Sequence, residues 1–304
     1  MNTKTKKKQL SPLACIIFGV LAIYLFIMSA MMLWTVLTTL KTVDEYTVGG
    51  AKYDNRGNKL WFAGKDGWTF KNYITAWQKF DVKVPATGKS YNIIWQFINS
   101  LLYSVGCAAA VTLTSLVMGY ATARFRYKLS GYIYAFVLVT MALPIVGSMP
   151  SEMAVADKLN ILDTFPGLWI MRANFLNTYF LIFFAQFKMI PRDYTEAAKI
   201  DGANPLAVMC KIIVPLAAGT ISTVFVLSFI TFWNDYQIPM LYLESHPVAA
   251  WGMHQFVNEG LSTEISNTPT RLAGVCLMAA PIVVFYAVFN KKLNVNLSVG
   301  GIKG

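Results

Sequence analysis

The sequence PLACIIFGVLAIYLFIMSAMMLWTVLTTL, residues 12–40, contains no charged side chain. Further uncharged runs follow at 90–123, 129–151, 212–234 and 272–290, and a shorter one at 173–187 reaches a useful length only by extending back past Arg172 towards Gly167. A helix needs about 20 mostly apolar residues to cross a membrane. Only 13% of the 304 residues are charged, about half the fraction in an average soluble domain. The sequence therefore predicts an all-α integral membrane protein with six transmembrane helices.

The N-terminal segment carries four lysines between residues 4 and 8, ahead of the first apolar run, as a signal peptide would. The apolar core of a signal peptide is about 7 to 15 residues long, whereas the run here is about 28 residues long. We therefore expect a retained first helix that begins in the cytoplasm. The segment SPLAC resembles a lipoprotein cleavage site, but Cys15 precedes its apolar run instead of following one, which excludes lipidation.

The cysteines and histidines do not form a recognisable metal or redox pattern. Cys15, Cys107, Cys210 and Cys276 are far apart in the sequence and include no CxxC pair, which favours small apolar packing residues. The two histidines, His246 and His254, are eight residues apart, which is no known ligand spacing. We expect no bound metal and no cofactor.

The distribution of charge predicts the orientation in the membrane. The link RFRYK at 124–128 and the C-terminal tail are basic and contain no acid, whereas the short links on the opposite side are acidic. Lys and Arg concentrate in cytoplasmic loops, so both termini are expected in the cytoplasm. The loop at 41–90 has nine Lys/Arg against five Asp/Glu. We still place it outside, because the other loops agree on that orientation.

These signals divide the chain into five parts. They are a basic cytoplasmic N-terminus at 1–12, a first transmembrane helix at 13–40, an extracytoplasmic loop at 41–90, a five-helix core at 91–290 with a cytoplasmic polar segment at 188–215, and a cytoplasmic tail at 291–304. The net charge of +11 is then a consequence of topology together with the 41–90 loop. No nucleic-acid partner is expected.

The segment KVPATGKS at 83–90 ends like a phosphate-binding loop, with Gly88, Lys89 and Ser90 in place. That motif requires glycine at its first position, because the backbone must curl tightly around phosphate, and Lys83 occupies that position here. The segment also lies on the outer side of the predicted topology, away from ATP. We expect no nucleotide site in this chain, so any ATP hydrolysis takes place in a partner.

The polar segment EAAKIDGANPLAVMCKIIVPL at 196–216 has consistent helix signals. Asp193 is expected to cap a first helix, with Glu196 as its capping-box partner. Gly202 fits a left-handed helix end, and Asn204 and Pro205 fit the start of a second helix. The apolar face of the second helix is predicted to comprise Leu206, Met209, Cys210 and Ile213. The result is a short helix–turn–helix at the cytoplasmic membrane surface, which either docks a partner or merely connects two spans.

The residues EAAKIDGA followed by IIVPL resemble the EAA motif of permease subunits in bacterial ABC importers. More specifically, they resemble the carbohydrate-uptake group related to the maltose permeases. Other matching segments are MALPIVGSMP (141–150), LNILDTFPGLWI (159–170), FKMIPRDYTEAAKIDGA (187–203), SFITFWNDYQIPML (228–241) and the tail SVGGIKG. Recognisable pattern covers roughly 70–304, whereas 43–66 departs from the family as an insertion or a long first loop.

This resemblance implies a transport subunit of the bacterial cytoplasmic membrane and not an enzyme. It implies a sugar substrate, two ATPase subunits per complex, a second permease that we expect to be a different chain, and an extracytoplasmic solute-binding protein. The residues that it assigns to ATPase docking are Glu196, Ala197, Ala198, Asp201, Gly202 and Ala203. The binding protein would deliver substrate to loops 41–90 and 244–268, where the resemblance assigns contacts to Gly252, His254 and Gly260.

A second group of residues lies near the outer end of the fifth predicted span. Asn234 and Asp235 either line a substrate pathway or cap a helix break before Pro239, and an acid at membrane depth favours a function or a paired partner. Sugars are neutral and need no carboxylate, which favours the structural role. The aromatic rings of Tyr103 and Trp233 are candidates for stacking on sugar faces, although most Trp and Tyr residues in such proteins pack or lie at the membrane interface.

Two other classes compete with the importer. An ion-gradient-driven secondary transporter would be favoured by intramembrane acids or by inverted repeats, and here only Asp235 and no internal repeat is found. A membrane-embedded regulatory or scaffold subunit would use the polar segment to recruit something other than an ATPase. ATP-dependent uptake separates the importer from both.

Overall fold

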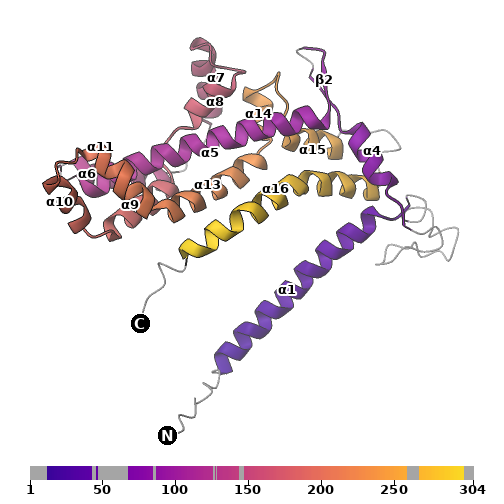
Figure 1. The fold of residues 1–304 in the computed structure, drawn as a ribbon. Coiled ribbons are helices and arrows are strands. Elements are labelled where there is room, and N and C mark those ends of the chain that lie inside the picture. The colour runs from indigo at the N-terminus through magenta and orange to yellow at the C-terminus, as the bar shows by residue number, and fades with distance from the viewer. Residues whose placement is uncertain are drawn as a thin grey trace, which may run out of the picture. The chain divides into compact units, whose positions relative to one another are not determined.

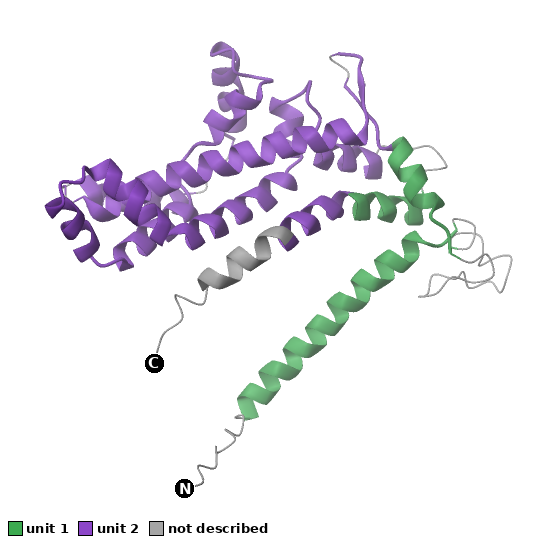
Figure 2. Ribbon diagram, viewed as in Figure 1, with its two compact units in different colours: residues 1–79, 260–277 green, residues 80–259, 278–304 purple. Residues whose placement is uncertain are grey.

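The computed structural model describes residues 12–42, 46, 68–84, 87–125, 127, 129–143, 147–258 and 267–297. These residues are mainly helical (Figure 1). They form two compact units, one made of residues 1–79 and 260–277 and the other of residues 80–259 and 278–304 (Figure 2). Each unit is considered by itself below.

The first unit contains α1 (Pro12–Thr39), α4 (Lys71–Lys79) and the beginning of α16 (Thr268–Leu297). Within α1 only Thr38 and Thr39 are buried, and the apolar side chains before them are exposed on every side. A long helix that is apolar all round belongs in lipid or in a protein interior. The exposure of α1 agrees with its prediction as a membrane span.

The second unit is built around α5 (Ile93–Arg124), which packs against α8 (Phe165–Arg172), α9 (Thr178–Met189), α13 (Ala218–Trp233) and α15 (Ala249–Asn258). Its other helices are α6 (Leu129–Ala142), α7 (Met149–Lys158), α10 (Asp193–Ile200), α11 (Pro205–Val208), the π-helical turn η1 (Met209–Ile213), α12 (Val214–Leu216) and α14 (Gln237–Tyr242). Glycine allows a close approach between α5 and α9. A Cβ at Gly119 would lie 2.8 Å from the Cβ of Phe183 on α9.

Two apolar cores lie along α5. One surrounds Tyr103 and Cys107 of α5 and includes Phe229 and Trp233 of α13. The other surrounds Leu116 and Tyr120, closer to the C-terminal end of α5, and includes side chains from α9 to α13. Because α5 contributes to both, it holds the two ends of the second unit together.

The described residues include three helices long and apolar enough to cross a membrane, namely α1, α5 and Thr268–Ala287 of α16. A fourth span results if Pro205–Leu216 and α13, which are bent by 76° at their junction, are taken together. The other two predicted spans are shorter here, because α6 ends at Ala142 and the run 167–187 is divided between α8 and α9. Asn177 caps α9 by accepting a hydrogen bond from the amide of Phe180. The count of six spans therefore stays a prediction.

The phosphate-loop-like segment is a β-hairpin. Strands β1 (Val82–Lys83) and β2 (Ser90–Tyr91) pair antiparallel, with Lys83 opposite Ser90. Gly88 has a φ of 65°, and its amide donates to the carbonyl of Val84 at 2.9 Å. A phosphate loop joins a strand to a helix, whereas here the Gly-Lys-Ser sequence leads into a second strand. The geometry agrees with an accidental sequence match.

Candidate functional site

Helix α10 carries the EAA sequence and begins directly after Arg192, whose side chain makes no capping hydrogen bond. Asp193 is thus the first helical residue and not the cap, and the predicted capping box with Glu196 was wrong. Both acids nevertheless lie in the first turn of α10. Carboxylates are favourable there, because the exposed backbone N–H groups carry partial positive charge.

The end of α10 matches its sequence-based prediction. Gly202 has a φ of 78°, which is the left-handed region. Its amide donates to the carbonyl of Lys199 at 3.0 Å, and the amide of Ala203 donates to the carbonyl of Ala198 at 2.9 Å. This pair of bonds is the Schellman arrangement that satisfies the last carbonyls of a helix. It fixes the direction in which the chain leaves α10.

The second helix starts as predicted but then departs from a regular α-helix. Asn204 caps it by accepting a 2.7 Å hydrogen bond from the amide of Ala207, and Pro205 is its first residue. The π-helical turn η1 follows. Because this turn holds an extra residue, it interrupts the 3.6-residue period on which the predicted stripe depended. Val208 and Ile213 are the buried residues, whereas Leu206 and Cys210 of the predicted stripe are exposed.

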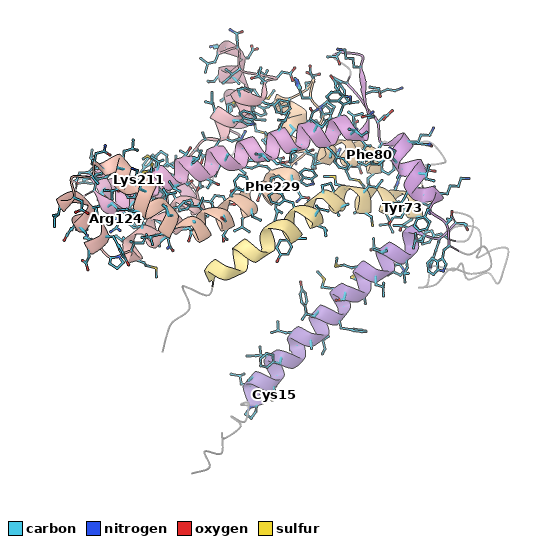
Figure 3. All side chains as sticks on the ribbon, viewed as in Figure 1. Cys15, Tyr73, Phe80, Arg124, Lys211 and Phe229 are labelled. Carbon is cyan, nitrogen blue, oxygen red and sulfur yellow. The ribbon has the colours of Figure 1, made fainter. Side chains whose placement is uncertain are left out.

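The two helices of this element pack onto the membrane helices through a buried apolar cluster. The helix–turn–helix contributes three residues to the cluster, namely Ala198 of α10, Val208 of α11 and Ile213 of η1. The partners on α5 and α9 are Leu116, Tyr120, Phe183 and Phe187. Figure 3 marks Arg124 and Lys211 at this end of the second unit. The element thus shares one buried apolar cluster with α5 and α9.

The outward surface of the same element combines acids with uncovered apolar groups. Glu196, Ala197, Asp201 and Gly202 are exposed. Other exposed side chains are Tyr194, Leu206 and Ile200, the last being 87% exposed. Exposed apolar groups rimmed by charges are typical of protein interaction sites. The predicted docking residues are thus brought together on one exposed turn, except that Ala198 is buried against the cluster and Ala203 is half-buried.

The residues predicted to line a pathway near the end of α13 are largely engaged within the chain. The Tyr103 hydroxyl donates to Oδ2 of Asp235 at 2.8 Å, and Oδ1 of Asp235 accepts from the amide of Ile238 at 3.3 Å. Trp233 is buried, with its ring 5.7 Å from that of Phe229. Asp235 therefore links α5 to the segment between α13 and α14 and accepts a bond from the first turn of α14.

Asn234 differs from its two neighbours because it is exposed. Its side-chain amide donates to the carbonyl of Ile230, within its own helix, at 2.8 Å. The bond orients the amide without covering it. Among the four pathway candidates, Asn234 is exposed, Asp235 is half-buried, and Tyr103 and Trp233 are buried.

The predicted loop at 244–268 contains the helix α15. Gly252 is buried in that helix, and a Cβ there would collide with the side chain of Gln96 on α5. A close helix contact thus accounts for this glycine. His254 is partly exposed and stacks on Tyr236, with ring centroids 4.5 Å apart. Gly260 lies outside the described residues.

A polar connection that the sequence did not predict joins the segment before α8 to the segment before α15. Oδ1 of Asp163 accepts from the amide of Ser245 at 3.0 Å and lies 3.3 Å from Nδ1 of His246. Asp163 has a φ of 56°, and aspartate is one of the few residues that tolerates this conformation. Burial raises the pKa of the Tyr242 hydroxyl, which donates to the backbone oxygen of Met149 at 3.2 Å.

Residues 112–294 match the family of the binding-protein-dependent transport system inner membrane component. The chain belongs to this family. The matched region contains the whole EAA-bearing helix–turn–helix and the apolar cluster that it shares with α5 and α9. The predicted membership among ABC importer permeases is confirmed, and nothing in the comparisons supports the secondary transporter.

Individual relatives resemble this permease over most of its length. A diacetylchitobiose uptake system permease protein of Streptomyces coelicolor is 23% identical over 94% of this chain and 88% of its own. A trehalose transport system permease protein of Mycobacterium tuberculosis is 30% identical over 68% of this chain and 78% of its own. A chain in the crystal structure of a bacterial ABC transporter that imports the acidic polysaccharide alginate has a TM-score of 0.70, with 20% identity and coverage of 94% and 99%. This last likeness supports the fold.

Proposed function

We propose that this permease carries a sugar or an oligosaccharide across the bacterial cytoplasmic membrane, driven by ATP hydrolysis in a partner subunit. The single observation that carries the proposal is the exposed EAA turn held on the α5–α9 cluster. The relatives named for diacetylchitobiose and trehalose support a saccharide as substrate. The chain itself would be a transport subunit and not an enzyme.

The coupling element at 188–215 would dock in a groove of the ATPase subunit. Glu196 and Asp201 would pair with basic groups of that groove, and the small side chain of Ala197 would allow close approach. Gly202 and Ala203 would set the turn. Ala198 would act from the inner side, because its methyl group packs against the cluster. Movement of the ATPase would then reach the membrane helices without any chemistry in this chain.

The assembly would hold two ATPase subunits, a second permease of different sequence and an extracytoplasmic solute-binding protein. Six spans with both termini in the cytoplasm place residues 1–12, 188–215 and 291–304 inside and the loop at 41–90 outside. The polar surface of Asn234, backed by Tyr103, Trp233 and Asp235, would face the sugar pathway. The region that meets the binding protein would include Gly252 and His254 of α15 and, further along the sequence, Gly260.

The proposal is tested by purifying the tagged permease from its native membrane and reconstituting the complex into liposomes. The expected result is co-purification of an ATPase subunit, together with uptake of radiolabelled oligosaccharides that requires ATP and the binding protein. Uptake driven by an ion gradient without ATP would overturn the proposal. An ATP-driven complex that transports no saccharide would overturn the proposed substrate class and leave the importer assignment in place.

A further inference from the structure

Helix α4 has an apolar side that is exposed among the described residues. Phe70, directly before the helix, and Ile74 and Trp77 within it follow i, i+4, i+7 spacing and so share one side. Their exposed fractions are 70%, 56% and 44%. Asn72 and Ala76, on another side, are buried. One side of α4 therefore holds the helix to the protein, and a second apolar side is left exposed.

The exposed apolar side has a polar border. Lys71, Thr75 and Gln78 repeat the same spacing one position further along, and the side chains of Lys71 and Gln78 are exposed. Helices that lie in the plane of a membrane interface are divided in this way, with aromatic and aliphatic groups on one side and lysine on the other. The long lysine stem lets its ammonium reach the headgroups while its methylenes lie against apolar surface.

Hydrogen bonds fix α4 to the end of the membrane span α1. The side-chain amide of Asn72 donates to the carbonyl of Thr39 at 2.7 Å and to that of Lys41 at 2.6 Å. The Thr39 hydroxyl donates to the hydroxyl oxygen of Tyr73 at 2.8 Å. All of these residues belong to one compact unit, coloured green in Figure 2. Tyr73 is labelled on α4 in Figure 3.

These bonds also set the depth of α4 in the membrane. With 28 residues, α1 is about 42 Å long, close to the full thickness of a bilayer including its headgroups, which is about 40–45 Å. Its last turn therefore lies at the headgroups. A second span, Thr268–Ala287, begins at the same place, because the Thr270 hydroxyl donates to Oδ1 of Asn72 at 3.3 Å. Helix α4 is thus held at the boundary between hydrocarbon and water.

We propose that α4 is an interfacial helix whose side formed by Phe70, Ile74 and Trp77 inserts into the lipid leaflet at that end of α1. Lys71 would then face the phosphate groups of the lipid. The apolar side continues the lipid-facing surface of α1, and tryptophan is enriched at this level of a membrane. The helix anchors the end of the span and so limits its tilt. The inference does not depend on which substrate is carried.

The proposal is tested by photo-crosslinking in the assembled transporter in native membranes. Benzoylphenylalanine replaces Ile74, Trp77 or Gln78 in separate full-length chains, and Met32 on the exposed side of α1 serves as the lipid control. After irradiation, mass spectrometry of the chain is expected to show phospholipid adducts at Ile74 and Trp77. Their yield should match that at Met32 and exceed that at Gln78 several-fold. Membrane recovery equal to that of the parent shows that each variant has folded.

Two outcomes would overturn the proposal. Cross-links from both Ile74 and Trp77 to a second permease or to the binding protein would identify that protein as the occupant of the apolar side. Lipid adducts no more abundant at these positions than at Gln78 would show that α4 lies in water. Gln78 directly follows Trp77, so the two cross-linkers lie at nearly the same level of α4 and differ in the side of the helix that they occupy.

Discussion

At the scale of single residues, Gly202 fixes the shape of the EAA turn through one backbone angle. A Cβ at this position would meet nothing within 4 Å, so crowding does not limit the side chain. The limit comes from the φ of 78°, where residues other than glycine are strained. Since both amides that close α10 belong to Gly202 and Ala203, a change in this angle redirects the start of α11.

Replacement of Gly202 should weaken ATPase docking least with asparagine, more with alanine and most with proline. Asparagine visits the left-handed region most readily, and alanine costs about 1 to 2 kcal/mol there. Proline is excluded, because its φ is fixed near about −65° and it has no N–H to bond the carbonyl of Lys199. The measurement is the amount of ATPase recovered per permease, followed by ATP-driven uptake. Gly131→Ala, in a helix and with open space around it, is the matched control.

Parental recovery of the ATPase by Gly202→Pro would mean that the turn is only a linker. Normal membrane insertion is expected for all three variants, because the turn is exposed and lies outside the cores of the spans.

Tyr103 and Asn234 should respond differently to substitution. Tyr103→Phe removes the hydrogen bond to Asp235 and should lower the free energy of unfolding by about 1 kcal/mol or more, leaving the KM for sugar unchanged. Asn234→Ala should raise KM with little effect on thermal stability, since Asn234 is exposed and its bond lies within one helix. Thermal unfolding in detergent and uptake kinetics give the two readouts. A raised KM in Tyr103→Phe alone would assign the sugar contact to the tyrosine.

At the scale of elements, α10 has an exposed side and a side that is buried in the apolar cluster. Ala197 and Ala198 are adjacent and identical in type, but Ala197 is exposed and Ala198 is buried against α5 and α9. Substitutions at this pair can therefore test the proposed docking separately from packing within the chain. A bulky side chain at either position disturbs only one of the two contacts.

Ala198→Leu should overpack the cluster and lower permease stability by about 1 to 3 kcal/mol. Ala197→Leu should leave stability unchanged and reduce recovery of the ATPase subunit, because the added volume stands on the docking side. Thermal unfolding and co-purification, measured on both variants, give the two readouts. Equal loss of stability in both would show that α10 has no distinct outer side.

The parts of this element that sequence could predict depend on neighbouring residues alone. Gly202, Asn204 and Pro205 act through their own backbone and the next three residues, so their roles were predicted correctly. The start of α10 and the π-helical turn η1 were missed, because the buried cluster with α5 and α9 competes with local capping and periodicity. The bond from Tyr103 to Asp235 spans 132 positions. No local sequence pattern predicts a contact over that distance. The sequence could therefore identify the pathway candidates but not their contacts with one another.

At the scale of the whole second unit, α5 is long enough to separate the segments at its two ends by a bilayer. Its 32 residues give a length of about 48 Å, enough to cross a bilayer of about 40–45 Å. The β1–β2 hairpin leads directly into its N-terminal end, and the coupling element packs near its C-terminal end through Leu116 and Tyr120. A crossing by α5 would put the hairpin and the EAA turn on opposite faces of the membrane. The proposed ATPase docking needs a cytoplasmic EAA turn, so we expect the hairpin outside.

This orientation predicts opposite labelling of two exposed lysine positions, Lys89 in the hairpin and Lys199 in α10. Lys89→Cys and Lys199→Cys are made in a chain whose four native cysteines are replaced and whose uptake activity is retained. A membrane-impermeant thiol reagent should label Lys89→Cys in intact spheroplasts and Lys199→Cys only after the membrane is opened. The reverse pattern would invert the topology and separate the EAA turn from cytoplasmic ATP. Labelling of both from the same side would show that α5 does not cross the bilayer, because its two ends would then lie in one compartment.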